Sequence, residues 1–396
     1  MTTAVVLFTR DLRVHDNPAL HTASATAQRI VPLFVLDPHI DAPPNRRRFL
    51  AESLADLREA LRRRGGDLIV RRGDPVRHSA DLAREVGAST IIVAADVSGY
   101  AADRERRLRR ASAEYRVALR VVDGITVVPP GALTPTGGGD HYRVFTPYWR
   151  VWRAFRRRSV LPAPTHVAVP DELDPGRLPG PGRAGSPDPL PGGEHAGRAR
   201  MRRWQGRVDT YGELRDDLAA DHSSRLSAYL HFGCVSPVEV ASTMDSSEAF
   251  LRQLCWRDFY HQVLAAFPRL RDQAYRPGAG DEWRDEPDAL AAWRSGTTGV
   301  PIVDAAMHHL RAEGFLPNRA RMIVASYLTK HLRLDWRLGA RWFDEWLLDA
   351  DVANNYGNWQ WIAGTGNDTR PYRRFNPHRQ AERFDPDGTY VRHWLA

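Results

Sequence analysis

Two tryptophans near the C-terminal end of the chain, Trp359 and Trp361, stand only two positions apart in the stretch NNYGNWQW. Their neighbours include Asn354, Asn355 and Gly357, and such residues favour turns and weaken helices. Ordinary packing in a core helix does not call for these neighbours. The pattern therefore predicts a functional site rather than plain packing.

A group of hydroxyls forms a second candidate, because Ser223, Ser224 and Ser227 lie beside Arg225 where an apolar helical pattern begins. Hydroxyls, a helix N-terminus and a cation together can bind phosphate. Serine at this position can equally cap the helix without any ligand. The spacing alone leaves both interpretations open.

Two further stretches combine aromatic, amide and cationic side chains. In QLCWRDFYHQ, Trp256 and Arg257 adjoin Asp258, which also fits a core helix with a surface ion pair. In GFLPNRARM, Asn318 and Arg319 open a helical pattern. Asparagine and arginine suit base-edge and phosphate contacts, and a solvated helix start explains them equally well.

The elements that must hold these residues differ between the two halves of the chain. In the first half, five runs rich in β-branched residues alternate with helical patterns, at 4–8, 29–37, 67–71, 89–96 and 119–124. This alternation predicts an α/β domain with a five-stranded parallel sheet and right-handed crossovers. One helix on the sheet is indicated by an apolar stripe, formed by Leu50, Leu54, Leu57 and Leu61. No GxGxxG follows the first run, so the domain is Rossmann-like in architecture only.

Residues 161–200 are rich in proline and glycine and predict a linker without regular elements. Helical patterns such as PIVDAAMHHLRAEG follow and predict a second domain that is all α. Nine of the 12 tryptophans lie at or beyond Trp256, where core burial is their usual role. We expect the α/β domain over 1–130, the linker over 131–200 and the helical domain over 201–396.

The composition limits the classes of function. The 56 Lys and Arg against 48 Asp and Glu leave a net charge of +8, which fits a polyanionic partner and also a solvated basic surface. Cys234 and Cys255 lack paired spacing, so neither a disulfide framework nor a thiolate metal site is predicted. No run has the length of a membrane span or of a signal peptide core. We expect a soluble, cytoplasmic protein without a metal.

Taken together, the motifs resemble the photolyase/cryptochrome family, whose flavoproteins repair pyrimidine dimers with blue light or sense that light. The matching stretches follow in family order and cover almost the whole chain: FTRDLRVHDNPAL, SSRLSAYLHFGCVSP, WRDFY, TGVPIVDAAMHHL, NRARMIVASYLTKHL, DADVANNYGNWQW and RFNPHRQAERFDPDGTYVRHW. The resemblance is greatest to cyclobutane pyrimidine dimer photolyases. It implies a monomer that acts on damaged DNA, with a light-sensing cryptochrome as the rival function.

The resemblance implies an FAD site in the helical domain. The residues implied to hold the diphosphate and ribityl groups are Tyr211, Ser223, Ser224, Leu226 and Ser227, with Arg257 as a cationic partner. Arg321 and Asp349 are implied to form a buried ion pair beside the isoalloxazine, which suits electronic tuning more than stability. Asp351 is implied to lie near its polar edge, and Asn355 near N5, where it stabilises the reduced flavin.

The same resemblance implies that three tryptophans transfer electrons to the flavin along a chain of indole rings. Trp359 takes the place nearest the flavin, Trp336 the middle place and Trp283 the exposed one. Core packing is the alternative role for each ring.

The substrate pocket implied by the resemblance holds a dimer that has left the duplex stack. Trp256 and Trp361 are implied to stack on it, and Asn318 with Met322 match the cyclobutane dimer type of pocket. Neither of these two is the histidine that (6-4) photoproduct repair uses. Gln253 stands where the family's repair enzymes carry glutamate, and its missing charge puts the rate or specificity in question.

Further expectations concern the antenna, the tail and DNA. Asp103 and Arg104 replace the asparagine and glutamate of folate-binding relatives, which argues against a folate antenna. A deazaflavin between the domains, or no antenna, is the alternative. The chain ends with VRHWLA, so no long signalling tail is expected. The arginines implied to contact the DNA backbone, with salt-dependent binding, are Arg215, Arg319 and Arg373, assisted by Arg374.

Overall fold

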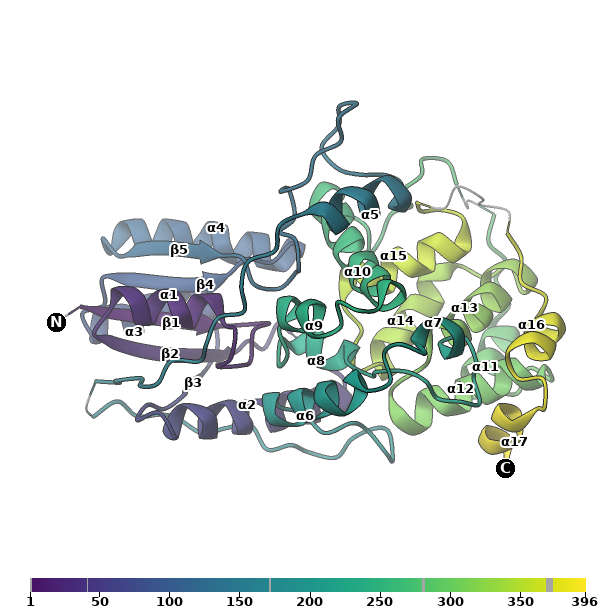
Figure 1. Cartoon of the computed structure of the whole chain (residues 1–396), viewed down its shortest axis with the longest axis horizontal. Helices are drawn as coiled ribbons and strands as arrows, with labels where there is room; N and C mark the ends of the chain where they lie inside the picture. Colours follow the sequence, from purple (N-terminus) through teal and green to yellow (C-terminus); the bar gives the residue numbers. More distant parts are fainter. Residues whose placement is uncertain (1, 41, 171, 280–281, 368–372) are drawn as a thin grey trace.

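The computed structural model describes residues 2–40, 42–170, 172–279, 282–367 and 373–396. Figure 1 shows a sheet between helices at the N-terminal end of the molecule and a larger group of helices at the other end. The two termini lie at opposite ends of this arrangement. Within the described ranges no helix combines the length and the apolar character that crossing a membrane requires.

The predicted five-stranded parallel sheet is confirmed, with the order β3-β2-β1-β4-β5. Its strands are β1 Thr3–Phe8, β2 Arg29–Leu36, β3 Ile69–Arg72, β4 Thr90–Ala94 and β5 Ala118–Val122. Helices connect them: α1 Pro18–Thr26, α2 Pro44–Arg62, α3 Pro75–Glu85 and α4 Gly99–Glu114. The order of the strands reverses between β1 and β4, and the loops that follow these two strands meet at one edge of the sheet.

The central strands β1, β2 and β4 are buried on both faces, as is usual for a parallel sheet, whereas the edge strand β5 is partly exposed. Val5 and Leu7 of β1 pack in one hydrophobic cluster, whereas Val6 and Phe8 pack in another, because successive side chains of a strand point to opposite faces. The predicted leucine stripe lies on α2, where Leu54, Leu57 and Leu61 are fully buried.

The remainder of the chain is helical, with one isolated bridge between Arg284 and Leu334 among the described residues. The helices are α5 Phe145–Ala154, α6 Glu194–Gln205, α7 Tyr211–Leu214, α8 Ser227–Phe232, α9 Pro237–Thr243, α10 Glu248–Ala266, α11 Pro287–Ser295, α12 Pro301–Glu313, α13 Asn318–Ser326, the π-helical turn η1 Tyr327–His331, α14 Trp336–Trp346, α15 Val352–Ala363, α16 Pro377–Phe384 and α17 Thr389–Leu395. An α/β domain followed by helices is therefore the observed fold class.

The expected linker differs from the structure in two places. The aromatic stretch FTPYWRVWRA forms α5 because it buries an amphipathic face that includes Trp149 and Trp152. Residues 194–200 belong to α6, which starts after Gly193 and buries Met201 and Trp204. The prediction of no regular elements over 161–200 was wrong for its last residues, 194–200, because α6 buries apolar side chains at helical spacing.

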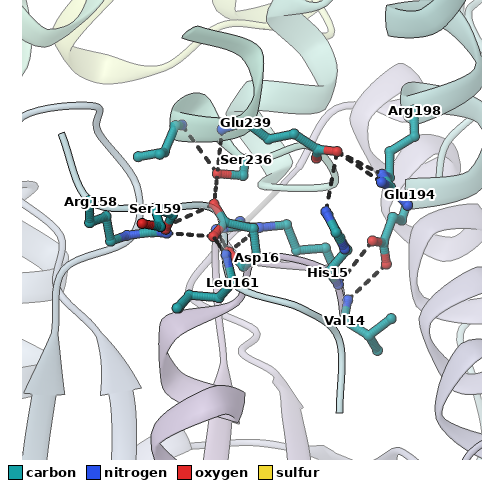
Figure 2. A network of polar contacts seen from close by, with 12 residues as sticks. Val14, His15, Asp16, Arg158, Ser159, Leu161, Glu194, Arg198, Ser236 and Glu239 are labelled. Atoms are coloured by element: carbon teal, nitrogen blue, oxygen red, sulfur yellow. Dashed lines mark hydrogen bonds and ion pairs between the residues drawn. The ribbon is translucent and has the colours of Figure 1, made fainter. Parts of the chain in front are cut away.

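A polar network joins the loop after β1 to the linker and to the helices (Figure 2). Asp16 is fully buried and accepts hydrogen bonds from Arg158, from Ser236 and from the backbone of Leu161, the last at 2.7 Å. The carboxylate of Glu194 on α6 accepts the backbone N–H groups of the same loop. The FTRDLRVHDN motif is thus a structural junction.

The same network continues to α9. Glu239 pairs with His15 at 3.3 Å and with Arg198 at 2.9 Å. One loop of the α/β part therefore contacts the linker, α6 and α9 through charged groups. This arrangement fixes the direction in which the side chains of that loop point.

Candidate functional site

The hydroxyl cluster lies in the turn that opens α8. Ser223 Oγ accepts the backbone N–H of Arg225 at 3.3 Å, and Ser224 Oγ accepts that of Leu226, also at 3.3 Å. The guanidinium of Arg225 is engaged by Glu313 at 2.7 Å and by Asp221 at 2.9 Å. Local backbone bonding by the two serines is therefore observed, while Ser227 is exposed at the start of the helix.

Tyr211 and Arg257 border this region from two other helices. Tyr211 packs its ring against Trp204 and Phe250, and burial raises the pKa of its hydroxyl to about 12. Arg257 on α10 donates from Nη1 to the carbonyl of Ile125 at 2.6 Å and from Nη2 to that of Leu230 at 3.3 Å. The guanidinium of Arg257 thus already binds backbone carbonyls of both parts of the chain, and its contact with a diphosphate stays a prediction.

The implied ion pair is present. Arg321 Nη2 lies 2.8 Å from Asp349 Oδ2, and Arg321 Nε donates to the carbonyl of Leu316 at 2.7 Å. Asp349 is buried, whereas the side chain of Arg321 is 25% exposed. The pair therefore sits at the wall of an accessible region rather than in a closed core.

Asp351 combines two functions at the start of α15. Its Oδ1 accepts the backbone N–H of Asn354 at 2.7 Å and so caps the helix. Its Oδ2 lies 3.3 Å from Nη2 of Arg10 and 4.0 Å from Nε2 of His261. Burial by itself raises the pKa of this carboxyl, but the fields of His261, Arg10 and Arg257 outweigh burial and hold the pKa below its usual range.

Asn355 is held by two hydrogen bonds from its amide nitrogen. Nδ2 donates to the carbonyl of Ala340 and to Oδ1 of Asp344, each at 2.9 Å. Both amide hydrogens are thus used within the protein, and Oδ1 is the end that can accept a hydrogen bond from a ligand. The second oxygen of Asp344 accepts the hydroxyl of Tyr356 at 2.6 Å.

The turn residues of NNYGNWQW lie inside α15, so they do not form a turn. Each has a contact that outweighs its low helix propensity. Asn358 Nδ2 donates to the carbonyl of Asn354 at 2.7 Å. Gly357 leaves room for the ring of Tyr260, since a Cβ there would lie 2.2 Å from Tyr260 Cδ1.

The three tryptophans of the implied electron path lie on connected segments. Trp359 projects from α15 onto Gly339 of α14, where a Cβ would meet its ring at 2.2 Å. Trp336 is the first residue of α14, one helical turn before Gly339. The β-bridge between Leu334 and Arg284 brings Trp283 close to the start of this helix. Trp359 and Trp336 are both buried, at 2% and 0% exposure, and Trp283 is half-buried, so Trp283 is the most exposed of the three rings.

The residues implied to hold the substrate are partly or fully exposed. Trp256 and Trp361 are half-buried, and Arg373 lies 5.0 Å above the ring of Trp361. Asn318 is exposed on the first turn of α13, with Nδ2 at 3.5 Å from Sδ of Met322.

Two further residues lie next to Trp256 in the implied substrate site. Gln253 is half-buried on α10, one turn before Trp256. Phe145 of α5 stacks on Trp256 with ring centroids 3.7 Å apart and planes inclined by 3°. Sequence reasoning missed Phe145, although the aromatic run of α5 was a signal that the expected linker packs against the helices.

The arginines implied to contact DNA differ in exposure and in their partners within the protein. Arg215 and Arg373 are exposed. Arg319 is engaged by Asp216, with contacts of 3.0 and 3.3 Å, and covers the ring of Phe384 at 4.2 Å. Arg374 lies 2.9 Å from Nδ1 of His331. Arg319 must therefore exchange an internal partner before it can bind phosphate.

The polar side chains around Asp351 are suited to the polar edge of a flavin ring. Several buried polar atoms there have no hydrogen-bond partner among the described residues: His231 Nδ1, His261 Nε2 and Asp349 Oδ1. Buried polar atoms are almost always paired in native structures, so this region is suited to a ligand with its own donors and acceptors. In the described part of the chain, no cluster of three or more His, Cys, Asp or Glu side chains could hold a metal ion.

Comparison with known proteins agrees with this geometry. Residues 4–168 match the family model described as DNA photolyase, and residues 250–396 match that described as the FAD binding domain of DNA photolyase. A deoxyribodipyrimidine photo-lyase of Streptomyces griseus is 50% identical over 100% of this chain and 90% of its own length. A cryptochrome DASH of Gloeobacter violaceus is 38% identical over 99% of this chain and 85% of its own length.

Solved structures show the same fold over the full length. A class III photolyase from Agrobacterium tumefaciens superposes with a TM-score of 0.94 at 32% identity, covering 100% of this chain and 86% of that chain. A cryptochrome of Synechocystis superposes with a TM-score of 0.91 at 31% identity, covering 100% of this chain and 89% of that chain. The chain therefore belongs to the photolyase/cryptochrome family.

Proposed function

We propose that this protein binds FAD and splits cyclobutane pyrimidine dimers in DNA under blue light. The observation that carries the proposal is the contact of Asn318 with Met322 on the exposed side of α13. An amide can read base edges, and a thioether adapts to an apolar ring system. Neither residue supplies the acid or base that a histidine would supply at these positions.

In this proposal the residues of the site have separate functions. Trp256 and Trp361 stack on the two planes of a dimer that has been extruded from the duplex. Bound FAD supplies the electron that opens the dimer ring when it absorbs blue light. Asn355 offers Oδ1 to a hydrogen-bond donor, and its amide nitrogen is fixed by Asp344 and Ala340, so this acceptor does not reorient during the reaction.

Electrons reach the flavin in this proposal through Trp283, Trp336 and Trp359. The greater exposure of Trp283 supports this direction, because the half-buried ring is the one that a reductant in solution can reach. The packing of Trp359 on Gly339 supports contact between α15 and α14 along the path.

A light sensor of the cryptochrome type is the second candidate. Gln253 favours it, because an amide cannot provide the charge that a glutamate offers to a dimer radical. Similarity to a cryptochrome DASH over 99% of the chain also supports it. The tryptophan path serves either function, so it does not separate the two.

The antenna and the DNA contacts belong to the same proposal. A deazaflavin or a folate would lie between the α/β part and the helices. A photolyase from Sulfolobus tokodaii, with a TM-score of 0.90 at 30% identity, is described as holding two FAD molecules with the implication of a novel light-harvesting cofactor, which adds a second FAD to the candidates. Arg215 and Arg373 bind phosphates and make the affinity fall with salt.

Repair of a thymine dimer oligonucleotide by the reduced protein tests the proposal. We expect thymine to be restored under blue light and not in the dark. Gln253→Glu should raise the repair rate several-fold, because a hydrogen bond to a charged group contributes about 1.5–3 kcal/mol. Gln205→Glu, which adds the same charge at an exposed position at the end of α6, should leave the rate unchanged.

The outcomes separate the two functions. Repair by the wild type establishes the enzyme. If only Gln253→Glu repairs, the natural protein is a light sensor that has lost the catalytic carboxylate. If neither protein repairs while both bind FAD and dimer DNA, the pocket does not perform this reaction.

A further inference from the structure

A buried tyrosine lies beside the tryptophan path. Tyr356 on α15 is 1% exposed. Its ring meets the ring of Trp336 edge to face, with centroids 6.2 Å apart and planes inclined by 80°. Rings in van der Waals contact can exchange an electron without an intermediate carrier. Tyr356 is thus a neighbour of the middle tryptophan of the path, although neither its type nor its position was singled out from the sequence.

The hydroxyl of Tyr356 has a proton acceptor in place. It donates to Oδ2 of Asp344 at 2.6 Å, a length typical of a hydrogen bond to an ionised carboxylate. A phenol that loses an electron becomes a strong acid, so its oxidation at neutral pH requires a base within hydrogen-bond reach. Asp344 meets this requirement, and it lies on α14, the helix that begins with Trp336.

The surroundings of Asp344 suit it to this function. Burial raises the pKa of its carboxyl, against the hydrogen bond from Tyr356 and the charges of Arg46 and Arg271. A higher pKa makes the carboxylate a better proton acceptor. Asn355 donates to its other oxygen at 2.9 Å, which stabilises the orientation of the carboxylate toward the hydroxyl.

Tyr229 is a buried tyrosine whose hydroxyl and ring have partners different from those of Tyr356. It is as deeply buried as Tyr356, with 1% exposure, but its hydroxyl donates to the backbone carbonyl of Pro191 at 2.8 Å. A backbone carbonyl accepts a hydrogen bond but does not accept the proton itself. Its ring packs against Phe49, which is not readily oxidised.

We propose that Tyr356 is a redox-active residue that reduces the oxidised Trp336 and passes its proton to Asp344. The proposal rests on the tryptophan path of the proposed function. A photoexcited flavin is the initial oxidant and takes an electron from Trp359, which is then restored by Trp336. Tyr356 gives one electron to the Trp336 radical cation, its O–H bond breaks, and the proton moves to Asp344. The products are neutral Trp336, a neutral tyrosyl radical and a protonated Asp344, so charge and atoms balance.

This step lengthens the life of the separated charge. Return of the electron to Tyr356 requires the proton to move back from Asp344 at the same time, whereas a bare tryptophan radical needs no such movement. The tyrosyl radical lies next to Trp336 rather than at the surface, so it is a branch of the path and not its end at Trp283.

Illumination of the FAD-loaded, oxidised protein followed by electron paramagnetic resonance on frozen samples tests the inference. In the wild type we expect a tyrosyl signal that changes when ring-deuterated tyrosine is incorporated. Tyr356→Phe and Asp344→Asn should each lose this signal and retain a tryptophan radical. Tyr229→Phe is the matched control and should keep the tyrosyl signal. Formation of the radical in the wild type should be slower in deuterated water.

The results distinguish this inference from the path on which it rests. A wild type that shows only tryptophan radicals overturns the inference and leaves the path intact. A tyrosyl signal that survives in both variants also overturns it. Absence of any protein radical in the wild type contradicts the path and the inference together. Circular dichroism and the FAD content of each variant show that the fold is retained, and Asp344→Asn keeps the tyrosine, so loss of the ring is not the cause of its effect.

Discussion

His261 is a neutral imidazole enclosed by charged residues. Its Nδ1 lies 2.8 Å from the carbonyl of Arg257, and its Nε2 faces Asp351 at 4.0 Å. Burial lowers the pKa of the imidazole to about 4, with a further contribution from the charge of Arg257. The ring is therefore neutral at pH 7, and Nε2 is left as an acceptor toward the proposed flavin site.

Replacement of His261 by asparagine should flatten the pH dependence of stability. The unfolded chain binds a proton near pH 6.5 and the folded chain only near pH 4, so protonation favours unfolding as the pH falls between these values. The shift corresponds to roughly 3 kcal/mol at most. Urea unfolding at about pH 7 and about pH 4.5 measures the effect.

The control for this prediction is His21→Asn, because His21 is an exposed histidine on α1. It should leave the pH dependence unchanged. Asp258, whose pKa is raised to about 6 by burial, titrates in the wild type and in both variants and largely cancels from the comparison. Parallel pH profiles of wild type and His261→Asn would show that the imidazole titrates normally.

Matching the motifs to those of the family predicted which side chains form the site, but it did not predict the residues that hold them. Arg321 and Asp349 were predicted as a pair, and they are one at 2.8 Å. Asp344 and Phe145 were not predicted, because their importance depends on contacts with residues 12 and 111 positions away, namely Tyr356 and Trp256. No local pattern records such contacts.

Helix α15 shows how packing can override propensity. Its asparagines and glycine cost up to about 1 kcal/mol each relative to alanine, yet the segment is helical from Val352–Ala363. The helix begins with an Asp351 cap, and close packing of the Tyr260 ring on Gly357 requires the missing side chain. The sequence showed that the segment was special, and tertiary contacts decided its conformation.

Gly339→Ala should destabilise the contact between α14 and α15. The added Cβ would lie 2.2 Å from the ring of Trp359 and 2.8 Å from Leu328, so the ring or the helix must move. Overpacking of this kind costs about 1–3 kcal/mol. Urea unfolding measures the loss, and the yield of the tryptophan radical on illumination reports the displacement of Trp359.

Gly206→Ala is the control for Gly339→Ala, because it adds the same methyl group at a position away from the contact between α14 and α15. Nothing lies within 4 Å of the Cβ position at Gly206, and its backbone has the right-handed conformation with φ −67°. Alanine there should be neutral or stabilise the fold by up to about 1 kcal/mol. Equal stability of the two variants would mean that Trp359 does not rest on Gly339.

The order of the two folded parts was predictable from the periodicity of the sequence, whereas their docking was not. Alternation of strands and helices indicated the sheet, and helical runs indicated the remainder. The docking depends on the loop after β1, in which buried Asp16 binds Arg158 and Ser236 (Figure 2). These partners are far apart in the sequence and carry no periodic signal.

Arg10 in this loop contacts both the sheet edge and the helices. Its Nη1 lies 3.6 Å from Asp96 after β4, its Nη2 lies 3.3 Å from Asp351, and its Nε donates to the carbonyl of His231 at 3.1 Å. One guanidinium therefore connects the edge of the sheet, α8 and the start of α15. The two carboxylates are almost fully buried, at 7% and 6% exposure.

Arg10→Gln should weaken the association of the two parts. Loss of one partner from a buried ion pair costs about 3–5 kcal/mol, and we expect about 3 kcal/mol because the Arg10 side chain is 23% exposed. The sheet and the helices should then unfold in two separate transitions. Urea unfolding, followed by cleavage between the two parts with a protease, measures both effects.

Two comparisons decide whether the charge network causes this result. Arg62→Gln removes a pair with Asp67 in which the arginine is 51% exposed, and it should cost less than about 1 kcal/mol. Adding Asp96→Asn to Arg10→Gln should restore part of the stability, because one of the two buried charges left without a cation is removed. If Arg10→Gln behaves like Arg62→Gln and the second substitution restores nothing, the docking depends on apolar packing and not on Arg10.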